Sequence, residues 1–180
     1  MQRASIFAAT CLALATAALV VPAAHAEGRV RGRAVVQNPE GGAVARTGAA
    51  ASGPRGAMLR GRTVSSDGNG NVSGRSGAAF RGANGSTAAR AGSFQRNADG
   101  SASRQGSAAF TGPNGASGRT DGTLARDADG NITGQRDTTA TGANGGTYAG
   151  STTRADGTTT RTATCTNAAG DVVACPRPRN

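Results

Sequence analysis

The sequence predicts an all-β protein, an antiparallel meander of repeated β-hairpins that forms a thin sheet with little core. First, an Asn-Gly or Asp-Gly dipeptide recurs every 15 residues from Asn84-Gly85 to Asn144-Gly145. These dipeptides are the strongest short-range signal for a hairpin turn, and a period of this size indicates a repeat architecture. Second, large apolar residues are scarce, so a thick two-layer core is not expected.

The first 26 residues have the features of a secretory signal peptide. A basic start, Met1-Gln2-Arg3, precedes an apolar run from Ile6 to about Val21, and Ala24-His25-Ala26 fits an A-x-A cleavage site. The apolar run is shorter than the roughly 20 residues that a spanning helix needs. We therefore expect cleavage after Ala26, a secreted or periplasmic protein, and no transmembrane segment in the mature chain.

Residues 27–66 form an Arg/Gly-rich segment that is expected to be irregular. It contains Arg29-Val30-Arg31-Gly32-Arg33 and Arg60-Gly61-Arg62. Such segments bind nucleic acid through charge and stacking, but this one has no aromatic residue. Two turn candidates end at Gly41 and Gly56, 15 residues apart, which suggests that a degraded form of the repeat begins here.

Residues 67–157 are the predicted hairpin repeat region. Asn-Gly and Asp-Gly turns alternate along it, so the repeating unit is a 30-residue hairpin. We expect two-residue type I′ turns, which need positive φ at both central residues. That register would place Phe80, Ala89 and Phe110 in one row across three strands. It would also form a row on the opposite face from Arg75, Phe94, Gln105, Leu124 and Gln135.

Two other architectures remain open for this region. A β-solenoid with one coil per repeat would place apolar residues at the same phase in every coil. The positions two residues after the turn glycines fit this poorly, since they hold Val72, Thr87, Ala102, Ser117 and Ile132. A largely disordered chain is the second alternative, because few large apolar residues and a net charge of +10 are typical of disorder.

Residues 158–180 are expected to be a disulfide-stapled C-terminal hairpin and tail. Cys165 and Cys175 are the only cysteines left after removal of the signal peptide. An even number of cysteines in an oxidising compartment indicates a disulfide. A stapled end would also cap the repeat array, as such arrays require.

The residue types present argue against catalysis. The one histidine, His25, leaves with the signal peptide, so Ser-His and Cys-His nucleophile pairs are excluded. Lysine is absent, which excludes a P-loop. We therefore expect a non-enzymatic protein with no cofactor and no metal site.

Charge is distributed unevenly along the chain. From residue 27 to residue 104 there are 12 arginines against four acidic residues, and from residue 105 onward seven against six. A basic half suggests contact with polyanions such as anionic polysaccharide, lipopolysaccharide or nucleic acid. A solvated surface that keeps a thin sheet soluble is the alternative. The candidate anion-binding residues are Arg75, Arg81, Arg90, Arg96 and Arg104.

These features favour an exported bacterial repeat protein with a structural or adhesive role at the cell envelope or matrix. A basic face would contact anionic polymers. One alternative is a self-assembling module whose sheet edges add strands to copies of itself. The other is a disordered secreted polypeptide.

Overall fold

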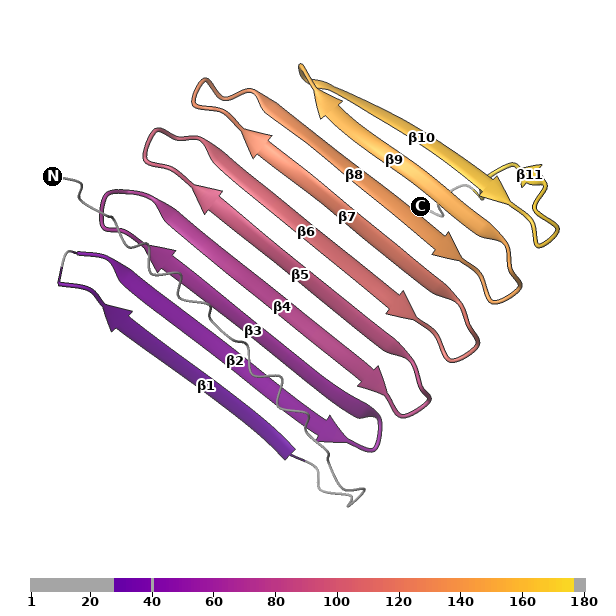
Figure 1. Cartoon of the computed structure of the whole chain (residues 1–180), viewed down its shortest axis with the longest axis horizontal. Coiled ribbons are helices and arrows are strands. Elements are labelled where there is room, and N and C mark those ends of the chain that lie inside the picture. Colours follow the sequence, from indigo (N-terminus) through magenta and orange to yellow (C-terminus); the bar gives the residue numbers. More distant parts are fainter. Residues whose placement is uncertain (1–27, 40, 177–180) are drawn as a thin grey trace, which may run out of the picture.

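The computed structural model describes residues 28–39 and 41–176, so the predicted signal peptide lies outside the described residues. The described chain forms one 11-stranded sheet whose strands follow the sequence order from β1 to β11 (Figure 1). Every neighbouring pair is antiparallel. The predicted meander of hairpins is therefore confirmed, and the solenoid alternative is wrong.

The strands are long and similar in length, nine to 11 residues apart from the last. Their bounds are β1 Gly28–Gln37, β2 Ala43–Gly53, β3 Gly56–Ser66, β4 Val72–Gly82, β5 Thr87–Arg96, β6 Ala102–Thr111, β7 Ser117–Arg126, β8 Ile132–Thr141, β9 Thr147–Ala155, β10 Thr158–Thr166 and β11 Val172–Val173.

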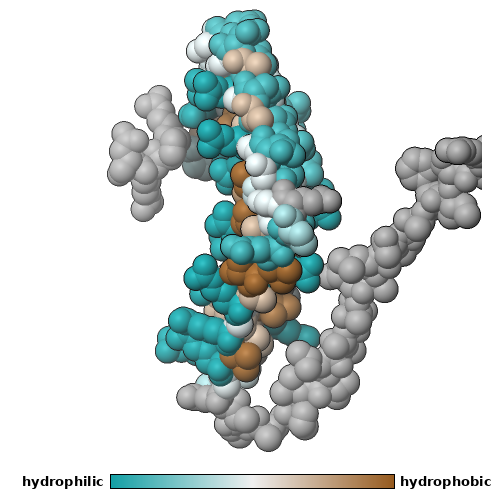
Figure 2. All heavy atoms as spheres, turned by 90° about the vertical axis from the view of Figure 1, so that its left-hand side faces the viewer, coloured by the Kyte–Doolittle hydropathy of each residue, from teal (hydrophilic) through white to brown (hydrophobic). Residues whose placement is uncertain are grey.

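The sheet is a single layer, seen from its β1 side as a narrow slab in Figure 2. Among the described residues Cys165 is the only buried hydrophobic side chain. Larger side chains remain in contact with solvent, as Leu59 at 61% and Phe110 at 50% exposure illustrate. The expected thin sheet with little core is thus present, and ladder hydrogen bonds and cross-strand pairs hold it together.

The segment expected to be irregular, residues 27–66, is instead part of the sheet. Its described residues form β1, β2 and β3, which pair in continuous register with β4. Glycines are paired at mid-strand across all four strands: Gly32 pairs with Gly48, Gly48 with Gly61, and Gly61 with Gly77. The prediction of irregularity was wrong because these glycines are a shared feature of the repeat rather than breaks in it.

Most of the repeat turns have three loop residues, not two. Between β4 and β5, Gly82 N donates to Ser86 O at 2.8 Å and Gly85 N donates to Gly82 O at 3.1 Å. Only the glycine has positive φ, 83° at Gly85. This is a type I turn followed by a left-handed residue, the usual three-residue hairpin loop. The predicted type I′ geometry is wrong for this turn.

The additional loop residue moves the register by one position. Phe80 pairs with Ala88 rather than Ala89, and Ala88 also pairs with Phe110. The second predicted row is likewise wrong, because Phe94 pairs with Gly74 and Arg104 instead of Arg75 and Gln105. A shift of one residue moves side chains to the other face of a strand, so Phe80 and Phe94 share a face.

The turn between β9 and β10 does follow the predicted two-residue form. Asp156 and Gly157 both have positive φ, 50° and 72°, and Ala155 pairs directly with Thr158. Asp156 is the only non-glycine residue with positive φ in the described chain. A two-residue loop also joins β2 to β3, where Gly53 pairs with Gly56.

Turns at one end of the sheet use Asn or Asp at their first position. In the β7–β8 turn, Asp127 Oδ1 accepts from Asn131 N at 2.8 Å and Asp127 Oδ2 accepts from Asn131 Nδ2 at 2.8 Å. The Asn131 side-chain bond, followed by the backbone bond from the same residue, lowers the pKa of Asp127. Asn97 holds the equivalent place in the β5–β6 turn and donates to Ser101 Oγ at 2.9 Å.

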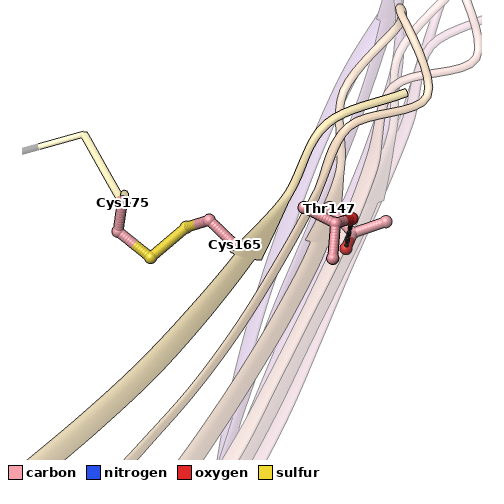
Figure 3. Close-up of a disulfide and its surroundings, with 4 residues drawn as sticks. Thr147, Cys165 and Cys175 are labelled. Carbon is pink, nitrogen blue, oxygen red and sulfur yellow. Dashed lines mark hydrogen bonds between the residues drawn. A yellow bond between two sulfur atoms is a disulfide. The ribbon is translucent and has the colours of Figure 1, made fainter. Parts of the chain in front are cut away.

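The C-terminal end carries the predicted disulfide. Cys165 and Cys175 are bonded, with their Cα atoms 5.2 Å apart. Strand β11 adds two pairs to β10, Cys165 with Val173 and Thr166 with Val172. Figure 3 shows the disulfide on one side of β10 and Thr147 on the other side. Thr147 Oγ1 lies 2.7 Å from Thr166 Oγ1, within hydrogen-bond distance.

The two edges of the sheet differ. The outer edge of β1 has no strand partner among the described residues, whereas β10 is partly covered by the short β11. The prediction of self-association through sheet edges stays a prediction. The described part of the chain contains no helix with the length and apolar character needed to cross a membrane.

Candidate anion-binding face

Each strand residue can be assigned to one of two faces from the register. Successive side chains of a strand point to opposite faces, and directly paired residues share a face. Two contacts agree with this assignment. Arg62 on β3 lies over the Phe94 ring on β5, 5.9 Å from its centroid. Arg136 Nε donates to Thr120 Oγ1 on the neighbouring strand at 3.0 Å.

One face gathers most of the arginines of the sheet, and we call it the arginine face. All of its arginine side chains are exposed. The twelve are Arg29, Arg31, Arg33, Arg60, Arg62, Arg90, Arg96, Arg104, Arg126, Arg136, Arg154 and Arg161.

The other face, the small-residue face, consists mainly of Gly, Ala, Ser and Thr from the described strands. It has four arginines, at positions 46, 75, 81 and 119, and both acidic residues that lie within strands, Asp121 and Asp137. Arg119 Nε lies 3.3 Å from Asp121 Oδ1. The arginine face therefore has no acidic side chain in the described strands, while the small-residue face has two carboxylates against its four arginines.

Arginines recur at regular intervals across the arginine face. One cross-strand row reads Arg31, Ala49, Arg60, Ala78, Arg90 and Ala108 from β1 to β6. Strands lie about 4.8 Å apart, so the guanidinium groups of this row leave the backbone about 10 Å from one another. The alanines between them leave each guanidinium accessible. This spacing produces an extended strip of positive charge rather than a single-anion pocket.

The aromatic side chains of the sheet lie on the same face. Phe80, Phe110 and Tyr148 share one row, next to the row that contains Arg90, and Phe94 lies nearer the other end of the strands. Several of these side chains lie over a glycine. A Cβ atom on Gly118 would be 2.5 Å from Phe110 Cε1, and a Cβ atom on Gly74 would clash with the Phe94 ring.

The five predicted anion-binding residues do not form one group. Arg90, Arg96 and Arg104 lie on the arginine face, whereas Arg75 and Arg81 lie on the small-residue face. Sequence reasoning missed the remaining arginines of the arginine face, among them Arg31, Arg60 and Arg62. The signal that could have found them is the odd or even position of each arginine in its strand.

The small-residue face has a shallow, open depression near mid-strand. Its lining includes Arg75, Gln105 and Gln135, with Asp121 and Asp137 beside them. Asp137 Oδ2 accepts from Gln135 Nε2 at 2.8 Å. The described residues contain no group of three His, Cys, Asp or Glu side chains that could hold a metal ion.

Comparison with known proteins adds no family to this geometry: no protein-family model, curated protein or solved structure matches the chain.

Proposed function

We propose that this protein is an exported, non-enzymatic scaffold of the cell envelope or matrix that binds extended anionic polymers through its arginine face. The observation that carries the proposal is the separation of charge between the two faces. In the described strands, twelve exposed arginines and no acidic side chain lie on one face, and four arginines and two carboxylates lie on the other.

The residue type supports an anionic ligand. Guanidinium groups stay charged at all physiological pH values and bind carboxylate, sulfate or phosphate through two parallel hydrogen bonds. The width of the arginine face supports a polymer, because its arginines extend from β1 to β10. A small anion would use one or two of these groups and leave the rest without a ligand.

A non-enzymatic role is supported by the shape and chemistry of the sheet. Enzyme sites are concave and exclude water around a few convergent groups. In the described residues both faces of the sheet are open to solvent. Cys165 is the only buried hydrophobic side chain there, and its sulfur is bonded to Cys175. A repeated surface of this kind suits many weak, equivalent contacts.

Heparin binding at several salt concentrations tests the proposal with a polyanion of simple chemistry. Counterion release makes the logarithm of the affinity fall linearly with the logarithm of salt concentration. For six ionic contacts the loss between about 50 and 200 mM salt is on the order of a thousandfold. We expect a loss of this size for the wild-type protein.

Two triple variants with the same change in net charge separate the faces. R31Q/R60Q/R90Q removes three arginines from the arginine face, and R46Q/R75Q/R81Q removes three from the small-residue face. The first should reduce the salt slope by about 2 to 3, and the second should change it little. Equal effects of the two triples, or heparin affinity that does not depend on salt, would overturn the proposal.

A further inference from the structure

We propose that the polymer bound by the arginine face is single-stranded nucleic acid, with bases stacking on Phe80 and Phe110 and phosphates held by the arginines around them. This inference rests on the proposed function and names the ligand class of the same surface. Proteins that bind single strands combine a positively charged track with exposed aromatic rings on which bases stack.

The Phe110 ring is held in place from below and is open above, and Phe80 lies in the same row, paired with Met58 and Ala88. The Phe110 ring lies over Gly118 on the next strand, where a side chain would collide with it. Phe80 and Phe110 are nevertheless 44% and 50% exposed. A glycine beneath an aromatic ring on a neighbouring strand is a known means of fixing that ring against a sheet. The opposite side of the ring is then available to a ligand.

Rings and guanidinium groups alternate across four adjacent strands. Arg60 is on β3, Phe80 on β4, Arg90 on β5 and Phe110 on β6. Ala88 pairs with both phenylalanines, and Arg90 follows Ala88 by two residues on the same face. Each phenylalanine therefore has an arginine diagonally beside it. A chain that crosses the strands would meet a ring and a cation in turn, as bases and phosphates require.

Phe94 is an example of a ring on the arginine face that already has a guanidinium group over it. The Arg62 guanidinium lies over that ring, 5.9 Å from the centroid, and Phe94 is only partly exposed. Arg62 belongs to an Arg/Gly-rich stretch that has no aromatic residue of its own. The sheet brings the two residue types together from strands β3 and β5, which supplies the stacking partner that the local sequence lacks.

Other polyanions fit these rings less well. In a duplex the base faces are stacked inside, and a broad flat sheet does not enter the major groove as a helix or a two-stranded ribbon does. An acidic polysaccharide would use the guanidinium groups but has no planar aromatic group to place on Phe80 and Phe110. The observations therefore favour a single strand with accessible bases.

The test compares the wild-type protein with F80L/F110L. Leu124 shows that a leucine can lie on this face over a glycine, since a Cβ atom on Gly134 would be 2.8 Å from Leu124 Cδ1. The double variant therefore keeps apolar cover and net charge but removes both aromatic rings. Far-UV circular dichroism confirms that it folds. L124A is the matched control, because it removes an exposed apolar side chain of the same face that has no aromatic ring.

Three probes are used at one salt concentration: oligodeoxythymidylate, an abasic deoxyribose-phosphate oligomer of the same length, and heparin. The wild-type protein should bind the oligodeoxythymidylate more tightly than the abasic oligomer. Loss of stacking weakens binding by about tenfold for each ring. F80L/F110L should therefore bind oligodeoxythymidylate about a hundredfold more weakly, with the abasic oligomer and heparin unchanged, and L124A should resemble the wild type.

Two outcomes would overturn the inference and leave the proposed function standing. In one, the oligodeoxythymidylate and the abasic oligomer bind equally and F80L/F110L has no effect, so the face responds to charge alone. In the other, heparin binds and neither deoxyribose oligomer does, which identifies an acidic polysaccharide as the ligand. Failure of all three probes to bind would overturn the proposed function as well.

Discussion

The two faces of this sheet are made by the same strands, yet they differ in almost every physical property. The arginine face carries most of the positive charge and the aromatic rings, whereas the small-residue face carries short side chains, both strand carboxylates and most of the threonines. Along the sequence these residues simply alternate. The difference shows that the composition of each face in this one-layer sheet is set by the register, because the register decides which alternate residues meet.

Glycines illustrate the same contrast. On the arginine face, Gly74, Gly118 and Gly134 each lie beneath a large side chain, and a Cβ atom there would meet it at less than 3 Å. On the small-residue face, a Cβ atom on Gly77 would lie 3.7 Å from the nearest atom, the carbonyl oxygen of Arg90, and one on Gly32 would have no neighbour within 4 Å. At these positions, glycine is therefore required for packing on the arginine face and is replaceable on the small-residue face.

Replacing Gly118 by valine should have the largest effect on stability. The new side chain would occupy the space of the Phe110 ring, and overpacking of this kind costs about 1 to 3 kcal/mol. We expect G118V to lower the free energy of unfolding by that amount in urea titrations followed by circular dichroism. It should also displace Phe110 and weaken oligodeoxythymidylate binding.

Gly77→Val is the matched control on the small-residue face. Gly77 is at mid-strand in β4 and has ordinary van der Waals space around its Cβ position. Because glycine in a strand interior costs about 0.5 to 1 kcal/mol relative to alanine, and valine favours strands, G77V should be neutral or stabilising. Equal destabilisation by G77V and G118V would show that the two faces do not differ in packing.

The sequence was sufficient to predict the meander, the strand length and the disulfide. Regular turn dipeptides show that a hairpin exists, and two cysteines in a short terminal segment have one pairing available. The register was not predicted, because a dipeptide such as Asn84-Gly85 fits a loop of two residues or of three. In the structure, Asn84 Oδ1 accepts from Ser86 N at 3.1 Å, and Ser86 becomes part of the turn.

A cue to the correct register was present in the glycines. In the three-residue register Phe94 pairs with Gly74, Phe110 with Gly118 and Leu124 with Gly134. The two-residue register would have placed Phe94 between Arg75 and Gln105, with no glycine beside the ring. The division of the five candidate arginines between two faces was missed for a related reason. Arg75 and Arg81 were grouped with Arg90 by nearness in the chain, which in a strand says nothing about the face.

Asp137→Thr should have a smaller, stabilising effect on the small-residue face. Asp121 and Asp137 are directly paired on β7 and β8, and like charges in this position destabilise a sheet by about 0.2 to 1 kcal/mol. Removing one of them should raise the free energy of unfolding by that amount in urea. The gain should shrink at high salt, since these side chains are accessible to screening ions.

Asp121→Thr serves as the control for this pair. It removes the same repulsion together with the 3.3 Å contact between Arg119 Nε and Asp121 Oδ1, whereas D137T removes the 2.8 Å hydrogen bond from Gln135 Nε2. Exposed ion pairs contribute little, at most about 1 kcal/mol, so we expect D121T as well as D137T to be stabilised. A loss of stability in both variants would show that the carboxylate pair does not destabilise the sheet.

The smallest expected effect is a decline of the free energy of unfolding at acid pH. It comes from aspartates in the turns at one end of the sheet. Hydrogen bonds from the Asn131 side chain and backbone lower the pKa of Asp127, and corresponding bonds from Asn71 and Asn69 lower the pKa of Asp67. A carboxyl whose pKa is lower in the folded state adds stability above its unfolded pKa, about 3.9. That contribution is lost as pH falls through the folded pKa.

Asp127→Asn tests this origin, because asparagine already holds the equivalent position at Asn97 and donates to Ser101 Oγ. The free energy of unfolding of the wild-type protein should therefore decline below about pH 4, and the D67N/D127N variant should decline less. The residual decline should come from Asp99, whose pKa is lowered by the Ser101 hydroxyl and backbone amide. Identical acid profiles for the wild type and the double variant would contradict this origin. They would show that the two turn carboxyls have the same pKa in the folded and unfolded chains. The hydrogen bonds between Asp127 and Asn131 would then add no charge-dependent stability to the sheet.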